Sequence, residues 1–437
     1  MDTLAELDRR LRTFDPWLPP WVVATMIEHG HLDEVRSQAE SGDWYCAVGL
    51  AQLLAGRGER DGVLDVIAPF IEIGWWEAVG AAADIIDNWG CRDEAVALVR
   101  PSAEAGDLSA IKRLATLLAG LGHTDEVITL LRPHAGKQVC GRALVNLTAG
   151  CGRGDTVMAL LPTVPAEPRF GEAPTVVGLP AAVLERQGRV DEALALLDTR
   201  IYHPNGASAN VIEQYADILA RHDRLPDLRE FAAGAGGRDA SYRLADLLEE
   251  RGHVDAAADV LRPFAAAGSP DATVGLADLL TRNDRFDEAV LVLRSASGAA
   301  AGDEGVLKSL LTLLTEHGRT EEAFAIIDDI AARNGGMSAE LFFERVWLLS
   351  CCGRAEQAII ELRARPDADT RNMKFRLADL LADTGCLEEA IAILTPTSGM
   401  DVAVLADLLI RGGRVKDAIA AWHERDTTPA FENPWAV

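Results

Sequence analysis

A short phrase recurs along the chain and constrains its fold more than any other feature. Each copy has an apolar helical stretch, a glycine or aspartate turn, and an acidic helix start, as in Gly-Arg-Val-Asp-Glu-Ala from Gly188 to Ala193. We expect each turn residue to take the left-handed conformation that closes a first helix. The acidic residues after it would lie at the start of a second helix and cap its free N–H groups. The 13 turns, spaced 28 to 36 residues apart, are at Gly30, Gly58, Gly90, Gly122, Gly152, Gly188, Asp223, Gly252, Asp284, Gly318, Gly353, Gly385 and Gly413.

Two columns of small residues accompany these turns. Alanine recurs seven residues before a turn, as at Ala245, and five residues after it, as at Ala257. Small side chains there allow two helices to approach closely, while leucines such as Leu244 and Leu248 supply an apolar stripe at helical spacing. One hairpin cannot bury such a stripe alone, but stacked hairpins can. The sequence therefore predicts an all-α fold, an α-solenoid of about 13 stacked helix-turn-helix repeats.

Over about residues 16–424 these repeats resemble the tetratricopeptide repeat family. The departures are an irregular spacing, aliphatic residues at most of the family's aromatic positions, and shifted prolines such as Pro101, Pro133 and Pro263. The resemblance implies a right-handed superhelix whose first helices line a concave groove. It also implies that the groove holds a protein or peptide partner.

Prolines interrupt the array once. Pro162, Pro165, Pro168 and Pro174 cannot continue a helix interior. We therefore expect a proline-rich linker or loop at residues 161–177, either a functional element or a neutral insertion. It would separate an N-terminal, tryptophan-rich block (16–160) from a C-terminal block (178–424). A capping helix is expected at 1–15 and a tail at 425–437.

The composition limits the possible partners and compartments. Asp and Glu outnumber Lys and Arg by 68 to 42, giving a formal charge of −26. Because phosphate contacts need an excess of basic residues, we expect neither nucleic acid nor an anionic membrane as a partner. The first residues lack the pattern of a signal peptide, and no apolar run is long enough to span a membrane. The seven cysteines form no CxxC pair, which favours reduced thiols and a cytoplasmic location.

Motifs of the common enzyme classes are absent from the sequence. It contains no phosphate-binding GxxxxGK[ST] loop, no HExxH pair and no GxSxG elbow. His29 and His31 flank Gly30, but histidine recurs beside several turns in positions that arginine occupies elsewhere, so we interpret both as helix-end residues rather than metal ligands. The sequence therefore predicts a protein that is not an enzyme and holds no cofactor and no metal.

An acidic column is the first candidate site. Six residues before the turn, in the first helix of a repeat, stand Asp84, Asp217, Asp246, Asp278, Asp379 and Asp407. The resemblance implies that this position faces the groove, where a ladder of carboxylates would attract a basic partner. Beside it, ten residues before the turn, stand the aromatic residues Tyr242, Phe343 and Phe375. The alternative is that the aspartates only solvate an exposed face or pair with arginines such as Arg243 and Arg376.

The second candidate site lies in the N-terminal block, where six of the nine tryptophans occur. Tryptophan combines a large apolar ring with one donor and is enriched at interfaces. A pocket there would be formed by Trp17, Trp21, Trp44, Trp75, Trp76, Lys112 and Arg142. The alternative is that the rings fill a cap packed around nearby prolines.

Two functions follow from these sites. The first is a non-enzymatic scaffold that holds a protein or peptide with basic and apolar side chains in an acidic groove. The second is a small-molecule binding protein, for resistance or sensing, that uses the tryptophan-rich block.

Overall fold

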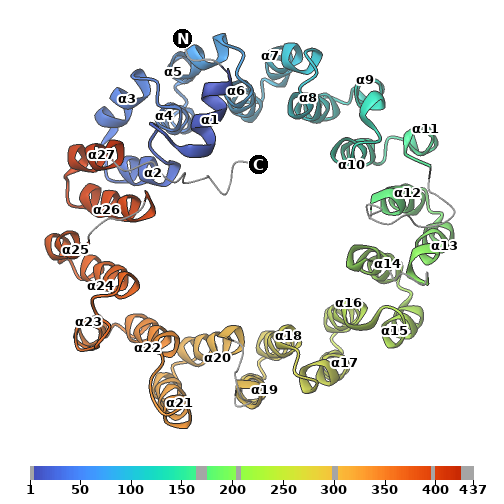
Figure 1. The fold of residues 1–437 in the computed structure, drawn as a ribbon. Helices are drawn as coiled ribbons and strands as arrows, with labels where there is room; N and C mark the ends of the chain where they lie inside the picture. The colour runs from blue at the N-terminus through green and yellow to red at the C-terminus, as the bar shows by residue number, and fades with distance from the viewer. Residues whose placement is uncertain (1–3, 164–174, 203–207, 298–303, 395–398, 425–437) are drawn as a thin grey trace. The chain divides into compact units, whose positions relative to one another are not determined.

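The structure, a computed structural model, describes residues 4–163, 175–202, 208–297, 304–394 and 399–424 (Figure 1). Within these ranges it has 27 α-helices, one short 3-10 helix and no strand. Helix α1 (Leu4–Thr13) comes first, and 13 helix-turn-helix hairpins follow it. The predicted all-α repeat fold is therefore confirmed, while the capping role expected for residues 1–15 stays a prediction. The expected tail, 425–437, and most of the expected linker, 164–174, lie outside the described residues.

All 13 predicted turn residues have a positive φ. The glycines lie between 69° and 83°, and Asp223 and Asp284 lie at 58° and 59°. At Gly188, the turn is closed by two backbone hydrogen bonds, from Gly188 N–H to the Glu185 carbonyl and from Arg189 N–H to the Leu184 carbonyl, both 2.9 Å. This is the Schellman pattern, in which glycine takes the left-handed position without a Cβ penalty.

The acidic residues after the turns lie in the first turn of the second helix, as predicted, but the expected capping role is wrong in the hairpins where it can be followed. The residue before α13 (Val190–Ile201) makes no side-chain cap. Asp191 and Glu192 of this helix instead accept hydrogen bonds from arginines, at 2.6 Å from Arg224 and 2.7 Å from Arg189. The capping rule failed because an arginine in reach offers a stronger, charge-assisted partner.

The two alanine columns are buried, as their spacing predicted. Members of the column before the turn are at most 2% exposed, and members of the column after it are fully buried. Ala245 and Ala257 illustrate the two positions, at 2% and 0%. Leu244 and Leu248 beside them are also buried. Neighbouring helices therefore approach across small side chains, and leucines fill the space around them.

Contacts divide the chain into two compact units. Unit 1 combines residues 1–121 with 354–437, and unit 2 spans residues 122–353. In each unit the even-numbered helices lie on one side and the odd-numbered helices from α3 onward on the other (Figure 1). We call these sides the even-helix face and the odd-helix face. The boundaries of these units differ from those of the expected blocks, 16–160 and 178–424. The interruption of the repeats at residues 161–177 remains a prediction.

Unit 1 contains the first and the last repeats. Its first helices after α1 are α2 (Pro20–Glu28), α3 (Leu32–Glu40), α4 (Trp44–Gly56), α5 (Arg60–Glu72), α6 (Trp76–Asn88), α7 (Arg92–Glu104) and α8 (Leu108–Gly120). Its last helices are α23 (Ala355–Arg363), α24 (Arg371–Asp383), α25 (Leu387–Ile393), α26 (Gly399–Arg411) and α27 (Val415–His423).

Helix α2 packs against α26, so the two ends of the array form one core (Figure 1). The indole Nε1 of Trp422 donates to the Trp17 carbonyl at 2.7 Å, and both rings are buried. Nearby, the Thr25 hydroxyl donates to Asp407 at 2.8 Å. Terminal repeats of a solenoid ordinarily end in a polar outer face. Here the first and last repeats cover each other.

Unit 2 contains the central repeats. Its first helices are α9 (Thr124–Leu131), the 3-10 helix η1 (Arg132–His134), α10 (Gln138–Leu147), α11 (Gly154–Leu160), α12 (Thr175–Arg186), α13 (Val190–Ile201) and α14 (Ala209–Arg221). The others are α15 (Leu225–Ala233), α16 (Gly237–Glu250), α17 (Val254–Ala266), α18 (Pro270–Arg282), α19 (Phe286–Ser297), α20 (Glu304–Glu316), α21 (Thr320–Arg333) and α22 (Ala339–Cys351).

Candidate functional site

Three members of the acidic column lie on consecutive even-numbered helices of unit 2. Asp217 is on α14, Asp246 on α16 and Asp278 on α18, each directly after a buried alanine. Asp217 pairs with Arg243 of α16, with Oδ1 2.9 Å from Nε. Asp246 and Asp278 are exposed and have no hydrogen bond or ion pair with another described residue. Desolvation by the protein around each carboxyl raises the pKa of both. Arg243 and Arg282 oppose this shift at Asp246, and Arg282 opposes it at Asp278.

The other three members lie in unit 1. Asp84 on α6 pairs with Arg113 of α8 at 2.8 Å, and Asp407 accepts from Thr25 across the contact between the two chain ends. Asp379 on α24 is exposed and has no such partner among the described residues. Desolvation raises the pKa of Asp379. The nearby Arg376 opposes that shift, and Asp383 adds to it. Half of the predicted column is therefore paired within the protein, as the alternative interpretation expected, and half is open.

The predicted aromatic residues lie beside the open carboxylates in two cases. Tyr242 is four residues before Asp246 on α16, and Phe375 is four residues before Asp379 on α24, so each pair shares one helix face. The Tyr242 ring also lies against α18, because a Cβ placed on Gly275 would be 3.2 Å from it. The Tyr242 ring gives Asp246 an apolar neighbour, whereas the Phe375 ring beside Asp379 carries the Arg371 guanidinium over it, 5.4 Å from the ring centroid.

The third aromatic residue belongs to a different arrangement. Phe343 on α22 is partly buried, and four residues later, at the position that aspartate holds in other repeats, stands the partly buried Trp347. Trp347 is not among the residues predicted for the candidate sites. It stands six residues before the turn Gly353, so the spacing rule itself would have found it. The even-numbered helices of unit 2 thus carry both carboxylates and large rings.

The tryptophans of the second candidate site form the core of unit 1. Trp17, Trp44 and Trp75 are 2%, 4% and 2% exposed. The rings of Trp44 and Trp75 meet edge to face, with centroids 5.0 Å apart, and Trp17 lies 5.8 Å from Trp75. The Trp17 indole donates to the Gly42 carbonyl at 2.8 Å. These contacts agree with the cap interpretation, in which rings fill space between helices.

The remaining residues of that site are more open. Trp21 and Trp76 are partly buried, while Lys112 on α8 and Arg142 on α10 are exposed. Neither basic side chain has an ion pair with another described residue. Lys112 belongs to unit 1 and Arg142 to unit 2, so they stand on separately described bodies. Ligand binding by these residues remains a prediction.

Residues 242–304 match the family model described as tetratricopeptide repeat, and this segment contains α17 and α18 with their turns. The chain is a divergent tetratricopeptide-like helical repeat protein. No curated protein matches its sequence significantly.

Several solved structures are similar to this tetratricopeptide-like chain at low identity. One is Naa15/Naa10 bound to HypK-THB, with 12% identity, a TM-score of 0.38, and coverage of 88% of this chain and 69% of that one. Another is the pentatricopeptide repeat protein PPR10 from maize, with 15% identity, a TM-score of 0.36, and coverage of 95% and 62%. The third is the APC/C hetero-tetramer Cut9–Hcn1, with 11% identity, a TM-score of 0.25, and coverage of 87% and 92%. This chain therefore spans less than two thirds of the maize protein.

The tetratricopeptide-like repeats are linked by arginines that the sequence analysis treated only as helix-end residues. An arginine directly after one turn reaches the acidic residue three positions after the preceding turn. In unit 2, Arg285 bonds Asp255 at 2.6 Å and also Glu288 on its own helix at 2.7 Å. The pairs are Arg153 with Asp125, Arg224 with Asp191, Arg285 with Asp255, Arg319 with Asp287 and Arg414 with Glu388. We call these the repeat clamps.

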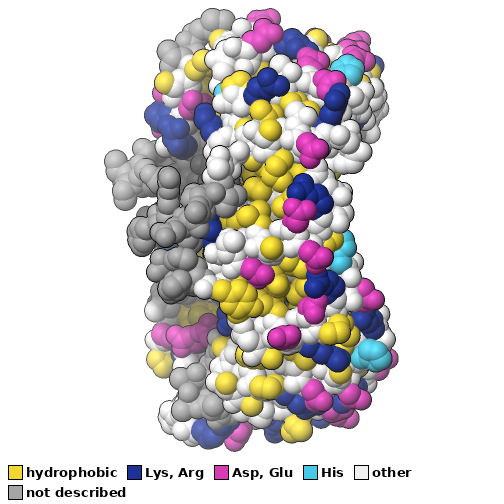
Figure 2. Space-filling view, turned by 90° about the vertical axis from the view of Figure 1, so that its right-hand side faces the viewer, with side chains coloured by type: hydrophobic (Ala, Val, Ile, Leu, Met, Phe, Trp, Pro, Cys, Tyr) yellow, Lys and Arg dark blue, Asp and Glu magenta, His cyan; other side chains and the backbone are white. Residues whose placement is uncertain are grey.

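Figure 2 shows one face of the molecule, where basic and acidic side chains lie next to each other around a band of hydrophobic ones. Ion pairs such as the repeat clamps place opposite charges together on the surface, although the chain as a whole has a formal charge of −26. Among the described residues, no cluster of three or more His, Cys, Asp or Glu could hold a metal ion. No described helix is long and apolar enough to cross a membrane.

Proposed function

We propose that this protein is a non-enzymatic scaffold whose even-helix face holds a protein or peptide carrying basic and apolar side chains. The observation that carries the proposal is the pair of open carboxylates, Asp246 and Asp278, on consecutive first helices of unit 2. Tyr242 adds an apolar ring next to Asp246 on the same face. A Lys or Arg of the partner would contact the carboxylates while an apolar neighbour packs on the ring.

The electrostatics of these carboxylates support a cationic partner. Both have a raised pKa because the surrounding protein desolvates them, and no described cation pairs with them. A partner's ammonium or guanidinium group would stabilise the ionised form and strengthen the contact. Attraction between an acidic face and a basic peptide would also speed their encounter at low salt.

In unit 1, Asp379 offers a similar open carboxylate beside Phe375. We propose it as a second contact of the same kind, on its own unit. The small-molecule function built on Trp17, Trp44 and Trp75 has no supporting contact, since those rings pack on one another. A cytoplasmic location fits the seven cysteines, which form no disulfide among the described residues; two are buried and three exposed.

The test begins with a displayed library of random peptides selected on the purified chain. We expect enrichment of sequences that combine Lys or Arg with apolar residues, and binding that weakens as salt rises. The best peptide is then measured against the triple variant Asp246→Lys, Asp278→Lys, Asp379→Lys. Its affinity should fall by about tenfold or more, because attraction is replaced by repulsion at each position.

A matched control carries the same change in charge on the odd-helix face. Glu94→Lys, Glu230→Lys and Glu356→Lys alter exposed acidic residues that have no ion pair with another described residue. This variant should bind the peptide as the parent protein does. Equal losses in both triple variants would mean that net charge alone attracts the peptide, and the even-helix face would lose its assigned role.

A further inference from the structure

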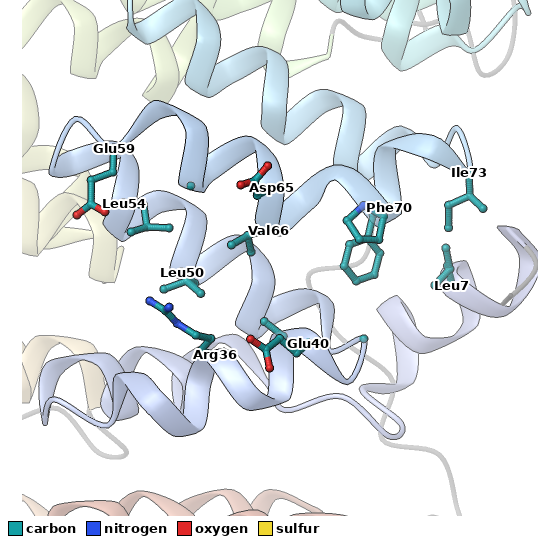
Figure 3. Close-up of a pocket in the computed structure, with 14 residues that line it drawn as sticks. Leu7, Arg36, Glu40, Leu50, Leu54, Glu59, Asp65, Val66, Phe70 and Ile73 are labelled. Carbon is teal, nitrogen blue, oxygen red and sulfur yellow. The ribbon is translucent and has the colours of Figure 1, made fainter.

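Unit 1 contains a cavity of about 670 Å³ between α3, α4 and α5 (Figure 3). Side chains of α3, α4 and α5 line it, and Leu7 of α1 lies at one end. This volume is within the range of about 300–1,000 Å³ that is typical of sites for small organic ligands. The cavity includes none of the residues proposed to contact the peptide, so it stands independently of the peptide-binding proposal.

One end of the cavity is lined by apolar side chains and the other end by a carboxylate. Figure 3 shows Phe70, Ile73 and Leu7 together at one end and Glu59 at the other. Leu50 of α4 lies between the ends and is 2% exposed. An elongated ligand would therefore place an apolar body at the Phe70 end and its polar group toward the Glu59 end.

Four charged residues surround the apolar lining, and three of them are acidic. Arg36, Glu40, Glu59 and Asp65 are all exposed, and none of their side chains has a hydrogen bond or ion pair with another described residue. This contrasts with the repeat clamps, where arginines and carboxylates are paired. The excess of two negative charges around an apolar cavity is complementary to a cation with an apolar body.

The repeat pattern has an exception beside this cavity. Glu59 follows the turn Gly58, in the position of the clamp arginines, and it is the only acidic residue among the 13 in that position. The residue that a clamp would reach, three positions after the preceding turn, is Asp33. Two carboxylates stand where other repeats have an arginine and a carboxylate. No clamp can therefore draw α3 and α5 together here.

We propose that this cavity binds a small amphiphilic organic cation. Its apolar body would contact Phe70, Ile73 and Leu7, and its ammonium group would lie near Glu59 and Asp65. Arg36 is the one positive charge on the lining and opposes binding of a cation. Its removal should strengthen binding, whereas removal of a carboxylate should weaken it.

Three probes with the same tail and different heads test this directly. Octyltrimethylammonium, octanol and octyl sulfate are titrated into the full chain and followed by calorimetry, below the concentration at which they aggregate. We expect one saturable site for the cation, weaker binding of the alcohol and none of the sulfate. No saturable binding of the cation, or equal binding of all three probes, would overturn the proposal.

Substitutions in the lining place the site. Gly62 lines the cavity on α5, and a Cβ there would meet only Leu54, at an ordinary contact distance of 3.4 Å. Gly62→Leu should therefore fill the cavity and abolish cation binding without a clash. Gly56→Leu, at the end of α4 with open space around its Cβ, is the matched control and should leave binding unchanged. Loss of binding in both variants would count against this cavity.

Charge variants then test the head group contact. The double variant Glu59→Gln, Asp65→Asn should lower the affinity for octyltrimethylammonium by about two- to tenfold, as expected for two exposed charge contacts. Asp61→Asn, an exposed neighbour outside the lining, should have no effect. Arg36→Gln should bind the cation more tightly. Weaker binding by Arg36→Gln would show that the head group does not meet the acidic lining. Thermal melts of each variant show whether it is folded.

Discussion

The contact between the first and last repeats leads us to expect a large loss of stability in Trp422→Ala. Trp422 is fully buried in α27 and donates its indole N–H to the Trp17 carbonyl at 2.7 Å. Truncation of a buried tryptophan costs about 3–5 kcal/mol. The Trp17 carbonyl loses its buried donor as well, at about 1–3 kcal/mol, although the two costs overlap. We expect a loss of about 4–6 kcal/mol in the free energy of unfolding of unit 1.

Trp422→Phe separates the two contributions. Phenylalanine keeps an aromatic ring in the core but has no donor for the Trp17 carbonyl, so its cost should be smaller, about 1–3 kcal/mol. Trp347→Ala in unit 2 is the control, because this tryptophan is only partly buried and lies outside unit 1.

The decisive assay is amide hydrogen exchange resolved by helix. In an ordinary solenoid, stability is a sum over nearest neighbours, and damage at the last repeat stays near that repeat. Because α2 packs on α26, we expect Trp422→Ala to lower protection in α2 and α3 as well as in α26 and α27. Full protection of α2 beside an exchanging α26 would refute the idea that the two ends stabilise each other.

Three further predictions concern protonation and backbone strain. Asp43 is buried, and desolvation raises its pKa to about 6 from an ordinary 3.8. Between these two pH values the folded state keeps the carboxyl proton, whereas the unfolded chain has lost it. Stability of unit 1 should consequently fall by about 3 kcal/mol as pH rises from about 4 to 6, and Asp43→Asn should flatten that slope in pH-dependent denaturation. Gly188→Ala, at φ 77°, should cost about 1–2 kcal/mol in urea unfolding. Gly62→Ala, in the first turn of α5, should gain about 0.4–1 kcal/mol, and a loss at both positions would contradict the backbone argument. Because the pKa values of Asp246 and Asp278 are raised, a basic peptide should bind more tightly as pH rises through and above the ordinary aspartate range, and a titration with no pH dependence there would contradict their role.

Some features followed from the sequence because local rules decide them. Each turn needs a residue that tolerates a positive φ, and glycine or aspartate does so with little cost, so every predicted turn was found. The alanine columns were also predictable, because each repeat packs on the next, and helices that approach closely require small side chains at the same place. The acidic residues were placed on the correct side of each turn, although their partners were not.

Only the tertiary structure decided which side chains form ion pairs and hydrogen bonds with each other. These contacts join residues that are far apart in the chain, or depend on how far a long side chain extends. The acidic column looks uniform in the sequence, yet Arg243 pairs with Asp217 while Asp246 stays open. The hydrogen bond from Trp422 to Trp17 joins residues 405 positions apart, which no repeat spacing reports. The cavity beside Glu59 likewise depends on how α3, α4 and α5 pack. Periodic spacing thus determined the repeats, whereas the three-dimensional packing determined which polar and aromatic groups remain available to a partner.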